Sequence, residues 1–101
     1  MTMVARGLAL GVLLSLMETA AFAEAPPFPP PGASACSGCH TTDPRLHNPV
    51  PRLIGRKPAD IVTALQDFKA GHRPATVMDR IAKGFSDDEI AAIAAWYGAQ
   101  R

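Results

Sequence analysis

Cysteine, aromatic residues and unbalanced charge are all scarce in this chain of 101 residues. Its two cysteines, Cys36 and Cys39, are so close in sequence that a disulfide between them would close a tiny loop and add little stability. The formal net charge of +1 lacks the excess of Lys and Arg on which binding to nucleic acid depends. The same balance argues against attraction to an anionic membrane surface. These shortages exclude a disulfide-rich scaffold, a nucleic-acid-binding protein and a membrane-surface protein.

Long apolar runs are also rare, and the most prominent one lies near the N-terminus. Gly7–Met17 is almost unbroken apolar sequence, follows a segment with one positive charge, and precedes Ala21-Phe22-Ala23. This is the pattern of a secretory signal peptide. About 11 apolar residues are too few for a bilayer, which needs roughly 20. We therefore expect residues 1–23 to be cleaved, and the mature chain to be periplasmic and without a membrane span. An uncleaved anchor is the alternative.

The expected mature chain, residues 24–101, has 78 residues with nine basic and eight acidic side chains. So short a chain is marginal for a self-sufficient hydrophobic core, and a buried cofactor would supply the missing contacts. Residues 24–32 are rich in proline and predict an extended polyproline leader. We interpret this leader as a stiff spacer, with a recognition motif as the alternative, and place the folded domain at residues 33–101.

Helix start and stop signals divide this domain into short helices. Pro58 suits a first helical position, Gly71 suits a helix end, and Ser86 with Glu89 forms a capping box. No segment alternates polar and apolar residues for long enough to predict a strand. The fold class is therefore all-α. The expected elements are a short helix over 33–40, an irregular loop over 41–57, a helix from 58 that ends at Gly71, a helical turn over 79–83 that ends at Gly84, and a last helix after Ser86. The apolar face of the last helix is formed by Ile90, Ile93, Ala94 and Tyr97, which precede Gly98.

The most specific motif in the domain is Cys36-Ser37-Gly38-Cys39-His40. Cys-x-x-Cys-His is the attachment motif of haem c. Residues i and i+3 share one face of a helical turn, so both sulfurs can reach one porphyrin, and His40 then serves as an axial ligand of its iron. A thioredoxin-like redox pair would need a βαβ context, and a zinc site would need a second pair of ligands. The motif therefore predicts one covalently bound haem c.

Met78 is expected to be the second axial ligand. It is the one methionine that follows the predicted signal peptide, and a thioether sulfur is a suitable soft ligand for haem iron. His47 and His72 are the rival ligands, and either would give bis-histidine coordination. A ligating histidine usually donates its free N–H to an acceptor. We expect the backbone carbonyl of Pro51 to accept that bond from His40.

Apolar residues along the whole domain are expected to wall the haem. Such walls exclude water and raise the reduction potential. Two roles stay open: Trp96 either packs or contacts a haem propionate, and Arg73 either donates to a propionate or is solvated. The expected wall residues are Val50, Leu53, Ile54, Leu65, Phe68, Val77, Ile81, Phe85, Ile93 and Tyr97.

Over residues 33–101 the chain resembles the class I c-type cytochromes with one haem. The haem motif and the segments Pro51–Gly55 and Phe68–Gly71 carry this resemblance. Thr76–Ile90 is similar to the haem subunit of the flavocytochrome c sulfide dehydrogenases, in which Met-x-Arg-Ile-Ala-Lys-Gly-aromatic-Ser recurs. The resemblance implies a small class I cytochrome c fold, with three to four short helices around the haem and the first and last helices in contact. It also implies that Met78 is an axial ligand.

Three functions are compatible with these features. The leading hypothesis is a periplasmic carrier of single electrons, the haem subunit that accepts them from a flavin-containing sulfide dehydrogenase subunit and passes them to other redox proteins. No catalysis is expected of the chain on its own, because it has no spare nucleophile or acid–base pair. A free soluble shuttle between respiratory complexes is the alternative. A haem-based sensor, in which a small molecule displaces Met78, is the third hypothesis.

Overall fold

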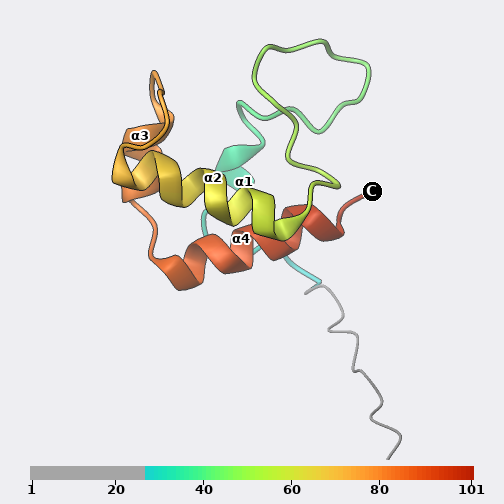
Figure 1. Cartoon of the computed structure of the whole chain (residues 1–101). Helices are drawn as coiled ribbons and strands as arrows, with labels where there is room; N and C mark the ends of the chain where they lie inside the picture. The colour runs from blue at the N-terminus through green and yellow to red at the C-terminus, as the bar shows by residue number, and fades with distance from the viewer. Residues whose placement is uncertain (1–26) are drawn as a thin grey trace, which may run out of the picture.

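The computed structural model describes residues 27–101. The predicted signal peptide, residues 1–23, and the first residues of the leader lie outside this range. The described part is helical and contains no strand, which confirms the all-α fold class (Figure 1). No helix within it has the length and the apolar character needed to cross a membrane. The helices are α1 (Ala33–Cys36), α2 (Pro58–Ala70), α3 (Met78–Lys83) and α4 (Asp87–Ala99).

Helix α2 begins and ends where its sequence predicts. Pro58 occupies the first turn, where its missing N–H leaves no hydrogen bond unmade, and Asp60 adds a favourable negative charge there. Gly71 ends the helix with φ of 76°, a left-handed conformation that glycine adopts without steric cost. The amide of Gly71 donates to the carbonyl of Phe68, which closes the last turn at 3.2 Å.

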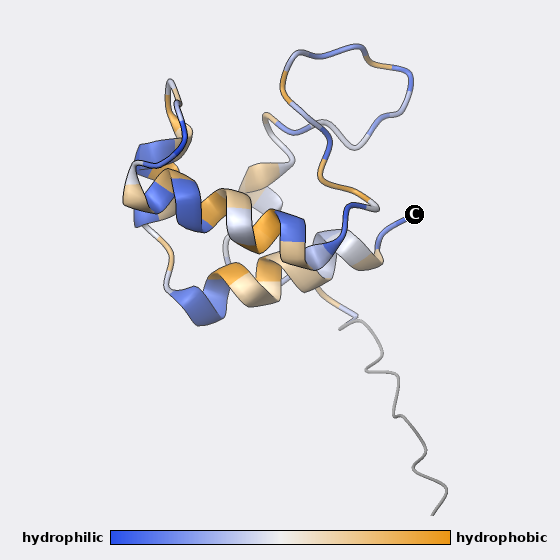
Figure 2. Cartoon of the chain, viewed as in Figure 1, coloured by the Kyte–Doolittle hydropathy of each residue, from blue (hydrophilic) through white to orange (hydrophobic). Residues whose placement is uncertain are grey.

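Helix α4 starts with the predicted capping box. The hydroxyl of Ser86 accepts from the amide of Glu89 at 3.2 Å, and the Glu89 carboxylate accepts from the Ser86 amide at 2.8 Å. Figure 2 shows apolar stretches in the middle of α2 and α4, where the two helices run side by side. The apolar face of α4 is buried as predicted, and it consists of Ile90, Ile93, Ala94 and Tyr97.

Helix α4 continues past Gly98 and ends at Ala99. Gly98 lies inside the helix at the point where α4 approaches the start of α2. A Cβ atom at this position would lie 2.6 Å from Cγ of Pro58 and 2.9 Å from the carbonyl oxygen of Arg56. The glycine therefore permits a close helix contact and does not act as a stop signal.

Replacing Gly98 with alanine is expected to destabilise the protein by about 1–2 kcal/mol, because overpacking outweighs the gain of roughly 1 kcal/mol in helix propensity. Denaturant unfolding of the haem-loaded protein measures this loss. Ala95→Gly, at an exposed position of the same helix, measures the difference in helix propensity between alanine and glycine without any change in packing. If Gly98→Ala stabilises the protein by as much as Ala95→Gly destabilises it, the close contact has no energetic weight.

Helices α1 and α3 differ slightly from their predicted bounds. The first was expected over 33–40 but ends at Cys36, after which the chain continues in hydrogen-bonded turns. The amides of Cys39 and His40 both donate to the Cys36 carbonyl, at 3.3 and 2.9 Å. Because the Cys36 carbonyl accepts from both amides, the regular pattern of helical hydrogen bonds ends at this point. Helix α3 begins at Met78, one residue before the predicted start, and ends at Lys83 as expected.

The core joins the first helix to the last through Ala33 and Tyr97. Both are buried, and they form one apolar cluster with Ile61, Ile93 and Ala94. The Tyr97 hydroxyl donates to the backbone carbonyl of Ala33, which would otherwise be an unsatisfied acceptor inside the protein. The contact between first and last helices is therefore present, and the aromatic side chain that makes it comes from α4.

Burial raises the pKa of Tyr97 above its ordinary value of 10.0, and the neighbouring Cys36 acts in the same direction. A raised pKa in the folded state means that the folded protein binds the proton more tightly than the unfolded chain. The resulting stability is complete below about pH 10 and is lost as the pH rises through the folded-state pKa of Tyr97.

We expect Tyr97→Phe to remove this alkaline loss of stability. At neutral pH the variant should lose about 1 kcal/mol with its hydrogen bond to Ala33. Unfolding free energies of the two haem-loaded proteins between pH 7 and pH 11 provide the comparison. A constant difference between them over the whole range would contradict the assignment.

Candidate functional site

A cavity of about 590 Å³ lies between the α1 turn, the following loop and helices α2 and α3. Its volume is within the usual range for sites that hold small molecules and cofactors. Most of its lining is apolar, and the chemically distinctive side chains on its wall are Cys36, Cys39, His40 and Met78. The structure thus brings the predicted attachment and ligand residues to one cavity from two separate parts of the chain.

Cys36 and Cys39 reach the same cavity although only the first is helical. The turn that follows α1 keeps the second cysteine close, through the bond from its amide to the Cys36 carbonyl. Both thiols are free, so the alternative of a disulfide between them is not realised in this structure. Burial raises the pKa of the Cys36 thiol above 9.0. The two sulfurs are therefore placed for attachment to one group in the cavity.

His40 lies with its Nδ1 atom 2.5 Å from the backbone oxygen of Pro51. Because a carbonyl can only accept, this contact assigns the ring proton to Nδ1 and leaves the lone pair on Nε2. A neutral imidazole with a free Nε2 is a metal ligand with a fixed orientation. The expected contact with Pro51 is present, while the role of His40 as an iron ligand stays a prediction.

Asn48 fixes the loop that carries Pro51, a role that the sequence analysis missed. Its side-chain amide donates to the carbonyl of Cys39 at 3.5 Å, and its side-chain oxygen accepts from the Val50 amide at 2.9 Å. One side chain thus ties the attachment turn to the segment before Pro51. The asparagine in the sequence Asn48-Pro49 is a common turn signal, but a turn signal does not reveal which distant carbonyl it contacts.

Met78 is the first residue of α3 and lines the cavity, whereas the rival ligands do not. His72 lies 4.0 Å from an oxygen of Asp67, on an exposed part of the chain. His47 is in the exposed loop and does not line the cavity. Among the described residues, the geometry thus favours Met78 over both histidines as the second ligand.

Eight of the ten expected wall residues line the cavity, and two do not. Ile54 lies in a turn that the amide of Arg56 closes by donating to the Leu53 carbonyl at 3.2 Å, and it lines a different depression from Leu53. Tyr97 is one turn beyond Ile93 but directs its hydroxyl to the α1 backbone. Both residues line a smaller depression of about 220 Å³ on the other side of α1.

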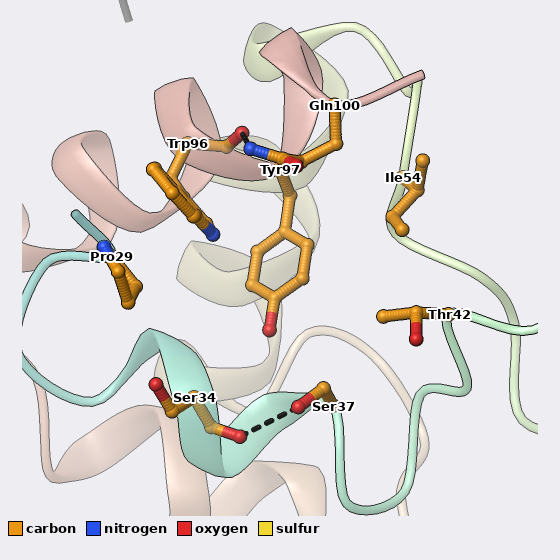
Figure 3. A pocket seen from close by; sticks show the side chains of 8 residues that line it. All are labelled: Pro29, Ser34, Ser37, Thr42, Ile54, Trp96, Tyr97 and Gln100. Atoms are coloured by element: carbon orange, nitrogen blue, oxygen red, sulfur yellow. Dashed lines mark hydrogen bonds between the residues drawn. The ribbon is translucent and has the colours of Figure 1, made fainter. Parts of the chain in front are cut away.

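Trp96 belongs to this smaller depression and not to the large cavity. Figure 3 shows Tyr97 between Trp96 and Ile54, with its hydroxyl directed towards the helix that carries Ser34. Pro29 of the leader lines the same depression. In the structure Trp96 therefore packs on the surface behind the attachment helix and does not line the large cavity.

The residues on the cavity wall fit a covalently bound haem. Two thiols, one imidazole with a free nitrogen and one thioether supply attachment points and soft ligands, and the apolar remainder excludes water. A haem held in this way supplies reversible one-electron chemistry. Val77 and Ile81 are 50% and 39% exposed although both face the cavity, so part of its apolar wall is still open to solvent.

Comparisons with known proteins agree with this chemistry. The chain is 47% identical over 64 residues to the cytochrome subunit of sulfide dehydrogenase from Chlorobaculum tepidum, a match that covers 63% of the chain and 58% of that protein. It is 36% identical over 62 residues to cytochrome c-552 from Acidithiobacillus ferridurans, covering 61% of the chain and 27% of that protein. No family model matches the chain.

The match to cytochrome c-554(548) from Halomonas halodenitrificans covers most of that protein. The identity is 35% over 69 residues, which span 64% of the chain and 83% of that protein. The matched proteins are all cytochromes, and the cavity presents both cysteines and the histidine of the haem c motif. This chain belongs to the c-type cytochromes, the proteins that hold haem c covalently.

Proposed function

We propose that this protein is a periplasmic carrier of single electrons with one haem c, and that His40 and Met78 are the axial ligands of its iron. The observation that supports the proposal is the position of both side chains on the wall of the cavity that also contains Cys36 and Cys39. The contact of His40 with Pro51 leaves its Nε2 atom free for the metal. The proposed cleavage of residues 1–23 accounts for export.

Ligation by both side chains leaves the iron no open position for a substrate. Within residues 27–101 there is no group of three or more His, Cys, Asp or Glu side chains that could hold another metal ion. The apolar wall favours the less charged ferrous state and so raises the reduction potential. These features suit a protein that accepts and releases electrons without transforming a substrate.

The proposed electron donor is a flavin-containing sulfide dehydrogenase subunit. This proposal rests on the similarity of Thr76–Ile90 to the haem subunits of that family and on the 47% identity to a protein of that description. The chain spans 58% of the length of that relative. Oxidation of sulfide would occur on the flavoprotein, and this chain would take the electrons one at a time and pass them to another redox protein.

Co-expression with a candidate flavoprotein tests the donor. We expect the two chains to elute together in gel filtration and the haem to become reduced when sulfide is added. Elution as a monomer, with no reduction by sulfide in the presence of the flavoprotein, would instead support a free soluble shuttle. Ready binding of carbon monoxide by the reduced protein would contradict two protein ligands and favour a sensor.

A further inference from the structure

Helix α3 carries Met78 at its start but buries little apolar surface of its own. Of its described residues only Ala82 is fully buried, and Ile81 is 39% exposed. Val77, which precedes the helix, offers no side-chain hydrogen bond to the first turn. Segments with few buried apolar contacts open more readily than the core of a protein. The position of α3, and of Met78 with it, therefore depends on contacts from other elements.

Lys69, in the last turn of α2, provides such a contact. Its ammonium group donates to the backbone carbonyl of Phe85 at 2.6 Å and lies 3.8 Å from a carboxylate oxygen of Asp87. Phe85 lies two residues after the end of α3, and Asp87 is the first residue of α4. Figure 1 shows α3 beside the end of α2 from which this lysine extends. One side chain thus connects three helices.

The bond to the Phe85 carbonyl is the contact of Lys69 that matters most for α3. The Asp87 side chain is 78% exposed, and an ion pair in such a place contributes little to stability. The Lys69 side chain is only 33% exposed, and a hydrogen bond from a charged donor is stronger than one between neutral groups. The amide of Phe85 already donates to the Ala82 carbonyl of α3, at 3.2 Å. Since Lys69 holds the carbonyl of the same residue, it connects the end of α3 to α2.

The turn between α3 and α4 is also part of the cavity wall. Phe85 and Ile81 line the cavity together with Met78, so a movement of this turn away from α2 would displace residues beside the proposed ligand. Lys69 itself does not line the cavity. Its influence on the site therefore passes through the position of α3.

We infer that Lys69 is a positioning residue, which holds α3 against α2 and so keeps the Met78 sulfur at the haem iron. The inference rests on the proposed ligation by Met78 and is independent of the proposed sulfide dehydrogenase partner. Without the bond from Lys69 to Phe85, α3 should open more often, and the iron should lack its second ligand for a larger fraction of the time.

Lys69→Leu tests the inference through the rate at which carbon monoxide binds to the reduced protein. Leucine keeps apolar bulk at this position but cannot donate to Phe85. Carbon monoxide reaches the iron only while Met78 is away from it, so the rate reports how often α3 opens. We expect binding to be about tenfold faster in the variant, the factor that corresponds to the loss of one charge-assisted hydrogen bond. The sulfur-to-iron charge-transfer band of the ferric protein should also disappear at a lower temperature.

Lys83→Leu is the matched control, because Lys83 is an exposed cation of α3 that does not line the cavity. Its rate should equal that of the unmodified protein. Lys69→Arg keeps a cationic donor, and its rate should stay closer to that of the unmodified protein than to that of Lys69→Leu. Lys69→Gln is a milder change, for the case in which the leucine variant does not fold, and it should raise the rate as well.

Gly98→Ala separates positioning from a general loss of stability, because Gly98 lies beside the start of α2, at the other end of α4 from α3. This variant should keep the slow binding of carbon monoxide. The inference is overturned if Lys69→Leu binds carbon monoxide at the rate of Lys83→Leu, or if Gly98→Ala accelerates binding as much as Lys69→Leu does. An unmodified protein without the charge-transfer band would instead contradict ligation by Met78 itself, and the inference would fail with it.

Discussion

Met78→Ala is expected to abolish the weak sulfur-to-iron charge-transfer band at the red end of the ferric spectrum. The thioether of Met78 is the proposed source of that band. Met78 lines the cavity and is the only methionine among residues 27–101. Loss of this ligand should also lower the reduction potential by well over the 59 mV that corresponds to a tenfold change. Carbon monoxide should then bind readily to the reduced variant.

The controls for this prediction are His47→Ala and His72→Ala. Neither side chain lines the cavity, so both variants should keep the charge-transfer band and a potential close to that of the unmodified protein. Absorption spectra and potentiometric titration of the three variants decide between the ligands. A band that survives Met78→Ala, or one that disappears with either histidine, would falsify the assignment of Met78.

The largest expected loss of stability follows from Gly32→Ala. Gly32 has φ of 85°, a left-handed conformation that costs an L-residue about 1–2 kcal/mol. A Cβ atom there would also lie 3.0 Å from Cζ of Phe85 and closer still to its Cε1. Overpacking of this kind typically costs a further 1–3 kcal/mol or so. We expect a total loss of about 2–5 kcal/mol, with the haem still attached.

Gly71→Ala is the matched control for this position. Gly71 has a similar φ of 76°, but no atom lies within 4 Å of the place where its Cβ would stand. It should therefore lose only the backbone term of about 1–2 kcal/mol. Denaturant unfolding of both variants isolates the contact with Phe85. Equal losses of stability for Gly32→Ala and Gly71→Ala would show that the contact with Phe85 has no effect on stability. If the contact does matter, the double variant Gly32→Ala, Phe85→Leu should lose less stability than the two single variants added together.

Local signals were sufficient to predict most of the helices. Pro58, Gly71 and the capping box of Ser86 and Glu89 act within a few residues of the ends that they define, and the structure places those ends as expected. The role of Gly98 could not be predicted, because it depends on Pro58, which is 40 positions away in sequence but close in space. Nothing in the local pattern distinguishes a glycine that ends a helix from one that admits a neighbour.

The part of the site that belongs to a sequence motif could be predicted. The spacing of Cys36, Cys39 and His40 predicts an attachment turn, and the structure directs all three side chains to one cavity. The exclusion of Ile54 and Tyr97 from the wall depends on the direction of each side chain, which composition does not give. Asn48 and the pairing of Gly32 with Phe85 required three-dimensional contacts.

The mass of the denatured protein tests the central claim most directly. After expression together with a working haem-maturation system, unfolding and removal of free cofactor, we expect the chain to retain the mass of one haem. The variant with Cys36→Ala and Cys39→Ala should retain none. A denatured chain that carries no porphyrin mass, although maturation succeeds for another c-type cytochrome in the same cells, would contradict covalent attachment at these two sulfurs.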